Sequence, residues 1–195
     1  MGHPSKTLIS QGDELEFAHF MSKYSSGLYS FARGFLRSKE TAEEVVSDVF
    51  LKLWKNRNKI SDIEDIKSYL FISVRNSCLT AIKRNRLNEV SLDELSSYNI
   101  ERIEVPEEEG FNTELIDSLN EAIESLPPKC KLVFSMAKLQ GFKRKEIAEI
   151  LDISQKTVEY HLKTAVTKLI DQVGNNKRHS AKEGVRLLTL LFNFF

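Results

Sequence analysis

Cysteine is scarce in this chain, and what there is forms no recognisable site. Cys78 and Cys130 lie far apart, with neither CxxC spacing nor a histidine nearby. This excludes a disulfide framework and gives no zinc-binding pattern. We therefore expect two reduced thiols, buried or half-buried in helices, and no metal or other cofactor.

Long apolar runs are absent as well. No stretch approaches the roughly 20 apolar residues of a membrane span, and the N-terminal residues lack the apolar core of a signal peptide. We expect a cytoplasmic protein. The 28 Lys and Arg residues balance the 28 Asp and Glu residues, so net charge gives no argument for nucleic-acid binding. An electrostatic argument for nucleic-acid binding therefore has to come from how the charges are distributed along the chain.

Positive and negative charges are segregated along the chain. Every charged residue in 67–86 is basic, whereas residues 89–124 are acidic apart from Arg102. This pattern is typical of a chain that binds phosphate through one segment and keeps a neighbouring segment away from it. Residues 88–112 contain Pro106, Gly110 and no periodicity, and predict a linker.

Elsewhere, apolar residues recur at steps of three and four, which predicts an all-α fold of two small helical domains. The expected helices before the linker cover residues 15–36 (one helix or two), about 38–54 and about 66–86, with a loop at 56–65. Those after it cover residues 113–126, 129–139 and a helix pair within 142–169. The expected organisation is therefore a polar segment 1–14, a first domain 15–87, a second domain 113–173, and a hinge and apolar tail 174–195.

The pair within FKRKEIAEILDISQKTVEYHLKTAVTKL (142–169) has the pattern of a helix-turn-helix. Asp152 occupies the turn position that requires a positive φ, and Ser154 is placed to cap the second helix. Plain packing of two helices is the alternative. Basic residues 143–145 favour DNA, and so does the exposed side of the second helix, whose side chains can reach phosphates and base edges in a major groove: Gln155, Lys156, Glu159, Tyr160 and Lys163.

Two further helices carry charged or polar faces. Glu44 and Asp48 belong to an acidic outer face of the helix at 38–54, where no His, Cys or Gly-rich loop accompanies them, so a solvated or protein-docking face is favoured over catalysis. The helix at 66–86 combines rings and amides with a basic edge. That combination suits single-stranded nucleic acid, although a basic core helix explains it equally well.

The C-terminal segment VRLLTLLFNFF is apolar on most sides, so another surface has to shield it from water. Packing against the chain's own domain is the first interpretation, docking to a regulatory protein the second, and membrane contact the third.

Three motifs, in order, resemble the extracytoplasmic-function (ECF) sigma factors, the smallest members of the sigma-70 superfamily of bacterial transcription initiation factors. AEEVVSDVFLKLWKN (42–56) resembles the region 2 helix that docks on polymerase, and SYLFISVRNSCLTAIKRNR (68–86) resembles the promoter-melting helix. IESLPPKCKLVFSMAKLQGFKRKEIAEILDISQKTVEYHL (123–162) resembles region 4. The apolar tail is similar to those of members from the Bacteroides group.

The resemblance implies a non-enzymatic initiation factor that directs core RNA polymerase to promoters. It implies recognition of the minus-ten element as single-stranded DNA and of the minus-thirty-five element as duplex. A membrane-bound anti-sigma factor is a further implied partner, and no small-molecule substrate is expected.

The resemblance also implies roles for individual residues. Minus-thirty-five contacts would come from Arg144, Ser154, Gln155, Lys156, Thr157, Glu159, Tyr160 and Lys163. Minus-ten contacts would come from Lys59, Ser61, Asp62, Tyr69, Arg75, Asn76, Lys83, Arg84 and Arg86. The polymerase clamp would contact Glu43, Glu44, Ser47, Asp48 and Lys52.

Three rival functions remain at this point. A dimeric regulator of duplex DNA would use the same helix-turn-helix but leave the basic helix at 68–86 unexplained. A carboxylate nuclease using Glu44 and Asp48 predicts metal-dependent cleavage. A protein-binding adaptor would leave the polar surface from Gln155 to Lys163 without a purpose.

Overall fold

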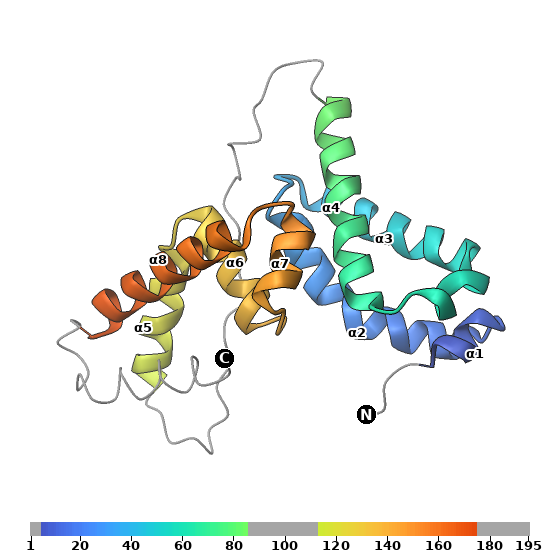
Figure 1. Cartoon of the computed structure of the whole chain (residues 1–195), viewed down its shortest axis with the longest axis horizontal. Helices are drawn as coiled ribbons and strands as arrows, with labels where there is room; N and C mark the ends of the chain where they lie inside the picture. The colour runs from blue at the N-terminus through green and yellow to red at the C-terminus, as the bar shows by residue number, and fades with distance from the viewer. Residues whose placement is uncertain (1–4, 86–112, 175–195) are drawn as a thin grey trace. The chain divides into compact units, whose positions relative to one another are not determined.

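The computed structural model describes residues 5–85 and 113–174, and within these ranges all regular structure is helical (Figure 1). The predicted all-α class is confirmed. The chain divides into two compact units, Met1–Ser97 and Tyr98–Phe195. The linker proposed at 88–112, Arg86 and the apolar tail lie outside the described residues.

The first unit is built on three long helices that pack against one another, with two short ones at one end. Its elements are α1 (Lys6–Ser10), α2 (Glu14–Arg33), α3 (Lys39–Lys55), the 3₁₀ helix η1 (Arg57–Asp62) and α4 (Ile66–Asn85). An oxygen of Asp13, Ser38 or Asp65 accepts a backbone N–H in the first turn of each long helix, at 2.9, 3.1 and 3.0 Å. Such caps fix where the helices begin.

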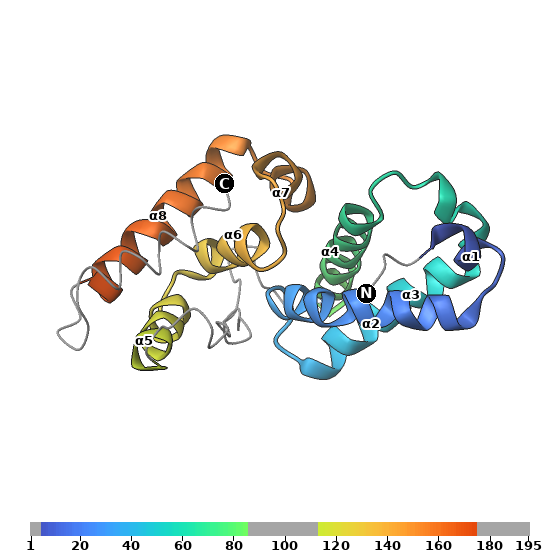
Figure 2. The same cartoon turned by 90° about the horizontal axis from the view of Figure 1, so that it is seen from below.

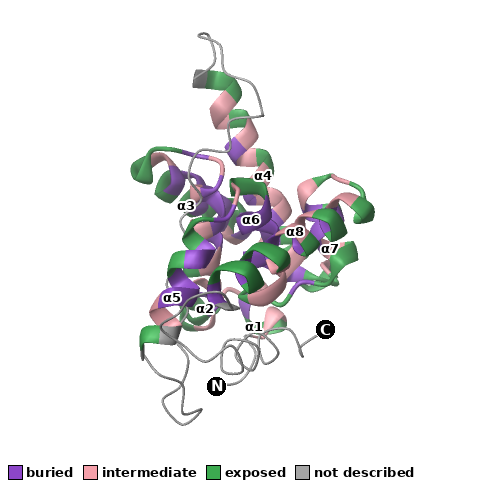
Figure 3. Cartoon of the chain, turned by 90° about the vertical axis from the view of Figure 1, so that its left-hand side faces the viewer, coloured by how far each residue is buried: buried purple, intermediate pink, exposed green. Residues whose placement is uncertain are grey.

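Aromatic rings fill the core of the first unit. The Phe17 and Phe50 rings meet edge to face at 6.4 Å between centroids, and those of Phe31 and Phe71 lie 5.0 Å apart. Buried positions lie along the inner sides of the helices and exposed ones along the outer sides, as Figure 3 shows. The periodic apolar residues therefore place the core, because one side of each helix is removed from water.

The second unit packs three helices on a long fourth one (Figure 2). They are α5 (Thr113–Glu124), α6 (Pro128–Lys138), α7 (Arg144–Leu151) and α8 (Gln155–Gly174). α6 begins with a proline, whose missing N–H costs nothing there. Gly141 follows α6 with φ +65°, a conformation that glycine adopts without strain.

Two sequence expectations need correction, and one that was left open is decided. The stretch 15–36, expected to hold one helix or two, holds one helix, α2, which ends at Arg33. The expected loop at 56–65 is largely the helix η1, which buries Ile60 completely. The expected polar segment 1–14 contains α1, which buries Ile9 and packs on η1. Each short helix buries a single residue, an isoleucine, and this pattern is too brief for periodicity to reveal.

Both cysteines are free and buried, as the sequence predicted. Burial raises the pKa of Cys78 to about 12, which makes a thiolate rare at neutral pH. None of the described helices is long and apolar enough to cross a lipid bilayer.

Candidate nucleic-acid and polymerase interfaces

The turn between α7 and α8 has the geometry that the sequence predicted. Asp152 adopts φ 56° and ψ 51°, in the left-handed region, and ends α7. The Ser154 hydroxyl accepts the backbone N–H of Thr157 at 3.0 Å and caps α8. The turn is therefore fixed at both ends, and the two helices are held at a set angle.

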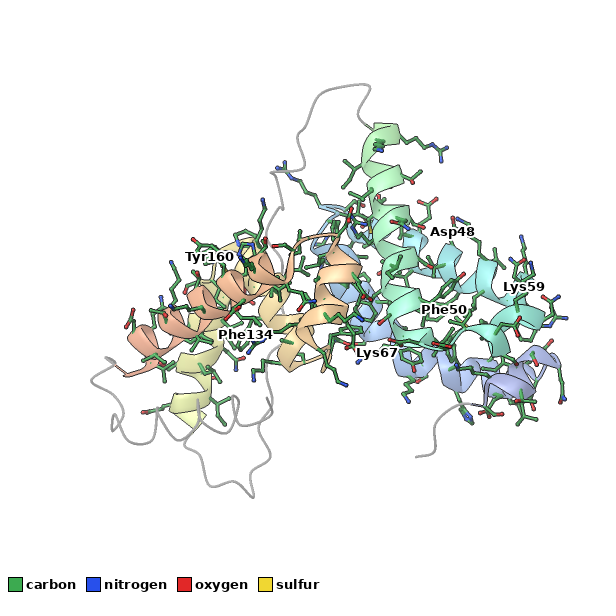
Figure 4. The ribbon with its side chains drawn as sticks, viewed as in Figure 1. Asp48, Phe50, Lys59, Lys67, Phe134 and Tyr160 are labelled. Atoms are coloured by element: carbon green, nitrogen blue, oxygen red, sulfur yellow. The ribbon has the colours of Figure 1, made fainter. Side chains whose placement is uncertain are left out.

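The two sides of α8 differ sharply in exposure. Val158, Leu162, Ala165 and Leu169 are buried against the rest of the unit. On the opposite side, Tyr160 is 66% exposed and projects from the helix in Figure 4. The exposed set also holds two cations, a carboxylate and an amide: Gln155, Lys156, Glu159 and Lys163. This surface offers both donors and acceptors to base edges.

Two other predicted residues flank that surface. Arg144 is the first residue of α7 and is exposed. Thr157 is half-buried, and its hydroxyl lies 2.8 Å from that of Ser154. Thr157 therefore takes part in the cap of α8, which leaves its hydroxyl less available to DNA than the sequence suggested.

His161 and Cys130 form a polar contact behind the exposed surface of α8. The His161 Nδ1 lies 3.5 Å from the Cys130 Sγ on α6. Burial, assisted by Lys129, lowers the pKa of His161, and burial raises the pKa of Cys130. His161 is consequently neutral at pH 7 and adds no positive charge for phosphate.

The predicted minus-ten residues of α4 occupy its outer side. Val74 and Cys78 are fully buried, whereas Asn76, Lys83 and Arg84 are exposed, Tyr69 is 43% exposed and Arg75 is half-buried. The C-terminal half of α4 extends beyond α2 and α3 in Figure 1. A basic, projecting helix with an exposed ring can follow a phosphate backbone and stack a base.

Lys59, Ser61 and Asp62 are all exposed on η1, and α1 braces the segment that carries them. The Lys6 ammonium on α1 donates to the backbone carbonyls of Ile63 and of Glu64, the latter at 3.1 Å. On the other side, the Arg57 guanidinium lies over the Trp54 ring, 4.7 Å from its centroid. Sequence reasoning missed Lys6, because only folding brings it to residues so distant in the chain.

Replacing Lys6 by methionine is expected to loosen this segment. The change keeps the aliphatic part of the side chain but removes its charge-assisted hydrogen bonds. One such bond, even when half-exposed, stabilises the folded segment by about 1 kcal/mol. Amide hydrogen exchange in residues 59–64 should become roughly fivefold faster, with α8 unaffected. Lys39→Met, at an exposed lysine outside the brace, is the control. Equal exchange in the two variants would contradict a brace.

The predicted polymerase contacts on α3 divide between two grooves. Ser47 and Asp48, with Leu51, Trp54 and Met21, line an apolar groove of about 430 Å³ between α2 and α3, here called the α2–α3 groove. Glu44, Asp48 and Lys52 line a polar groove of about 520 Å³ against α4, here called the α3–α4 groove. Figure 4 shows Asp48 and Phe50 on different sides of α3.

The α3–α4 groove therefore joins two residue sets that the sequence separated. Asn76 and Arg84, predicted for DNA, lie across it from Glu44 and Lys52, predicted for polymerase. Glu43 is exposed and lines neither groove. Among residues 5–85 and 113–174, no cluster of three or more His, Cys, Asp or Glu side chains is arranged to hold a metal.

Comparison with known proteins finds a matching family model for each of the two units. Residues 20–87 match the family model "Sigma-70 region 2", and residues 116–169 match "Sigma-70, region 4". The chain is 23% identical to the ECF RNA polymerase sigma-E factor of Haemophilus influenzae over 158 residues, 77% of this chain and 83% of that protein. It is 25% identical to the ferric citrate uptake sigma factor FecI of Escherichia coli over 152 residues, 78% of this chain and 87% of that protein.

Solved structures share the fold. The sigma factor RpoE of Bartonella quintana, in complex with the anti-sigma factor NepR, aligns with a TM-score of 0.52 and 18% identity, covering 83% of this chain and 99% of its own. CnrH, in complex with the cytosolic domain of CnrY, aligns with a TM-score of 0.50 and 17% identity, covering 88% of this chain and 96% of its own.

The two helical units thus define a transcription initiation factor. The chain belongs to the sigma-70 family, as an ECF sigma factor that directs RNA polymerase to promoters. This reading is favoured over the dimeric regulator.

Proposed function

We propose that the exposed side of α8 reads the minus-thirty-five element in the major groove. The observation that supports this most directly is the division of α8 into a buried apolar side and an exposed polar side behind a rigid turn. Glu159 accepts a hydrogen bond from a cytosine amino group, Lys163 donates to guanine, and Tyr160 contacts a neighbouring base. Phosphates are held by Arg144, Ser154, Gln155 and Lys156, with Thr157 at the edge.

The first unit, in this proposal, binds the minus-ten element as a single strand. The η1 segment, with Lys59, Ser61 and Asp62, captures an extruded base, and Asn76 reads a neighbouring one. Extrusion costs a few kcal/mol, which stacking and hydrogen bonds in the site must offset. The residues that hold phosphates or stack a base are Tyr69, Arg75, Lys83, Arg84 and Arg86.

Core polymerase is proposed to dock on the α2–α3 groove. An apolar groove rimmed by carboxylates suits an amphipathic coiled coil with basic flanks, such as the clamp coiled coil that the family resemblance implies. Ser47 and Asp48 line this groove, and Glu43 lies exposed on the same helix. Glu44 and Lys52 lie on the other side of α3, beside α4.

We further propose the partners and setting that the family implies. The protein acts in the cytoplasm, performs no chemistry of its own, and is held inactive by a membrane-bound anti-sigma factor. We also propose that it is of the Bacteroides-group type, because the sequence of its apolar C-terminal tail resembles the tails of members from that group. Recovery of core polymerase but no small regulator in pull-downs from the native cell, under every growth condition, would rule out the anti-sigma partner.

Substitutions on α8 test the proposed reading of the minus-thirty-five element. Glu159→Ala should change base preference at one position by roughly tenfold, because one acceptor is lost. Lys156→Ala should weaken binding to all sequences alike and reduce the slope of log affinity against log salt by about 1. Fluorescence anisotropy of holoenzyme on permuted promoter duplexes measures both effects. Uniform weakening by both changes would contradict the assigned roles.

A further inference from the structure

The α2–α3 groove is lined mostly by apolar side chains, and some of them face solvent. Phe17 and Met21 line it from α2, and Phe50, Leu51 and Trp54 line it from α3. Leu51 is exposed, and Met21 and Trp54 are half-buried. Apolar surface that gathers in one place on a protein usually marks a binding site. The groove is therefore expected to bind an apolar segment.

The groove extends for about two helical turns along both of its walls. On α2 its lining residues run from Glu14 through Phe17 to Met21, at steps of three and four, and on α3 they run from Ser47 to Trp54. Two turns correspond to roughly 10 Å of helix. A groove of this length suits a peptide segment that inserts side chains at positions i, i+3, i+4 and i+7.

A carboxylate lies at each end of the groove. The Phe17 and Trp54 rings lie 4.7 Å apart, so the Glu14 end of α2 is next to the Trp54 end of α3. Asp48 precedes Trp54 by nearly two turns and therefore lies at the other end. Both carboxylates are exposed. A segment that combines apolar residues with positive charge is favoured here, because its charge complements the rim.

The C-terminal segment 185–195 of this chain has these properties in its sequence. Apolar residues recur there at i, i+3, i+4 and i+7, at positions Leu187, Leu190, Leu191 and Phe194. At the same spacing Thr189 and Asn193 fall on a different, polar side. Four of the five Lys, Arg, Asp and Glu residues in 175–186 are basic, so positive charge precedes the apolar stretch. The segment therefore matches the groove in spacing and in charge.

The chain is long enough for the segment and the groove to meet. Residues 175–184 separate the segment from α8, and residues 86–112 separate α4 from α5. At about 3.3–3.6 Å per extended residue, the two stretches can span roughly 33 Å and 90 Å. Docking therefore requires no fixed arrangement of the two units. The covalent connection also favours docking within one chain over docking between two dilute chains.

We propose that the apolar C-terminal segment 185–195 occupies the α2–α3 groove of its own chain in the free protein, and that core polymerase has to displace it in order to dock. The segment shields both apolar surfaces from water. It also lowers the apparent affinity for polymerase, because only chains whose groove is free can bind. The inference rests on the proposed docking of polymerase on this groove.

Trp54 reports on the groove without any polymerase present. It is the single tryptophan of the chain and lines the groove. Removal of residues 185–195 should raise the acrylamide quenching constant of Trp54 about twofold, because its ring loses contact with the apolar side chains that cover it. The difference between the full and the shortened chain should be the same at every protein concentration, because the covering segment belongs to the same molecule.

Titration of labelled core polymerase gives the second measurement. Removal of residues 185–195 should tighten binding about fivefold, which corresponds to a groove that is occupied in roughly four of five free chains. Leu187→Glu combined with Leu191→Glu, in the full-length chain, should produce both effects, because the charged side chains are excluded from the apolar groove. Thr189→Glu combined with Asn193→Glu adds the same charge on the polar side. This matched control should keep both wild-type values.

Two results would overturn the inference and leave the proposed function intact. One is equal quenching of Trp54 in the full and the shortened chain. The other is a difference that appears only at high protein concentration, which would show that the segment of a second copy covers the groove. A rise in quenching without any change in polymerase affinity would place the segment in the groove but overturn the proposed docking of polymerase there.

Discussion

Replacing Leu51 by glutamate is expected to lower the affinity for core polymerase at least thirtyfold, about 2 kcal/mol, without unfolding the protein. Leu51 is 50% exposed, so the folded chain tolerates a charge there. In the complex, however, the carboxylate would be buried in the α2–α3 groove beside Trp54 and Met21 without a partner. Interface residues of this central, apolar kind carry most of the binding free energy.

The matched control is Leu15→Glu. Leu15 is 78% exposed and lies outside the α2–α3 groove, so the same change in charge and size should leave polymerase affinity within about threefold of wild type. Titration of labelled core polymerase with each variant measures the effect. Equal affinities for the two variants would show that polymerase does not dock on this groove.

Replacing Phe71 by alanine is expected to destabilise the first unit by about 3–5 kcal/mol, the usual range for a buried phenylalanine. Phe71 is 1% exposed, and its ring lies 5.0 Å from that of Phe31. For a unit of this size the midpoint of thermal unfolding should fall by at least about 12 °C. Because domains are only marginally stable, a loss of this size is a large fraction of the unit's free energy of unfolding.

Trp54 makes the measurement selective. It is the single tryptophan of the chain, and its ring lies 4.7 Å from that of Phe17, so its fluorescence reports on the first unit. Tyr69→Ala, on the exposed side of α4, is the control and should cost less than about 1 kcal/mol. A midpoint for Phe71→Ala close to that of Tyr69→Ala would contradict the described core.

Long periodic helices and their caps were predictable from the sequence. Clear apolar periodicity located α2, α3 and α8, a weaker pattern located α4, and Ser38 and Ser154 marked starts that the structure confirms. The left-handed conformation of Asp152 was also predictable, because the apolar faces on both sides leave room only for a tight turn. Local chemistry determines each of these features.

Tertiary packing determines what the sequence did not reveal. α1 and η1 pack on each other, each buries one isoleucine, and the Lys6 ammonium of α1 donates to carbonyls just after η1. Because these helices depend on contacts distant in the chain, neither has a strong local signal. From the sequence, the charged outer side of α3 was expected to be one continuous surface. Its division between two grooves depends on where α2 and α4 cross it, and periodicity along one helix does not contain that information.

Run-off transcription with sigma-free core polymerase tests the central claim most directly. Adding this protein to core polymerase and genomic promoter fragments should yield specific transcripts. Those transcripts should disappear with Asn76→Ala or with deletion of residues 157–162, because the first removes a proposed base contact and the second removes the reading surface of α8. Absence of transcripts from a protein that binds duplex DNA tightly by itself would contradict the account and favour a dimeric regulator.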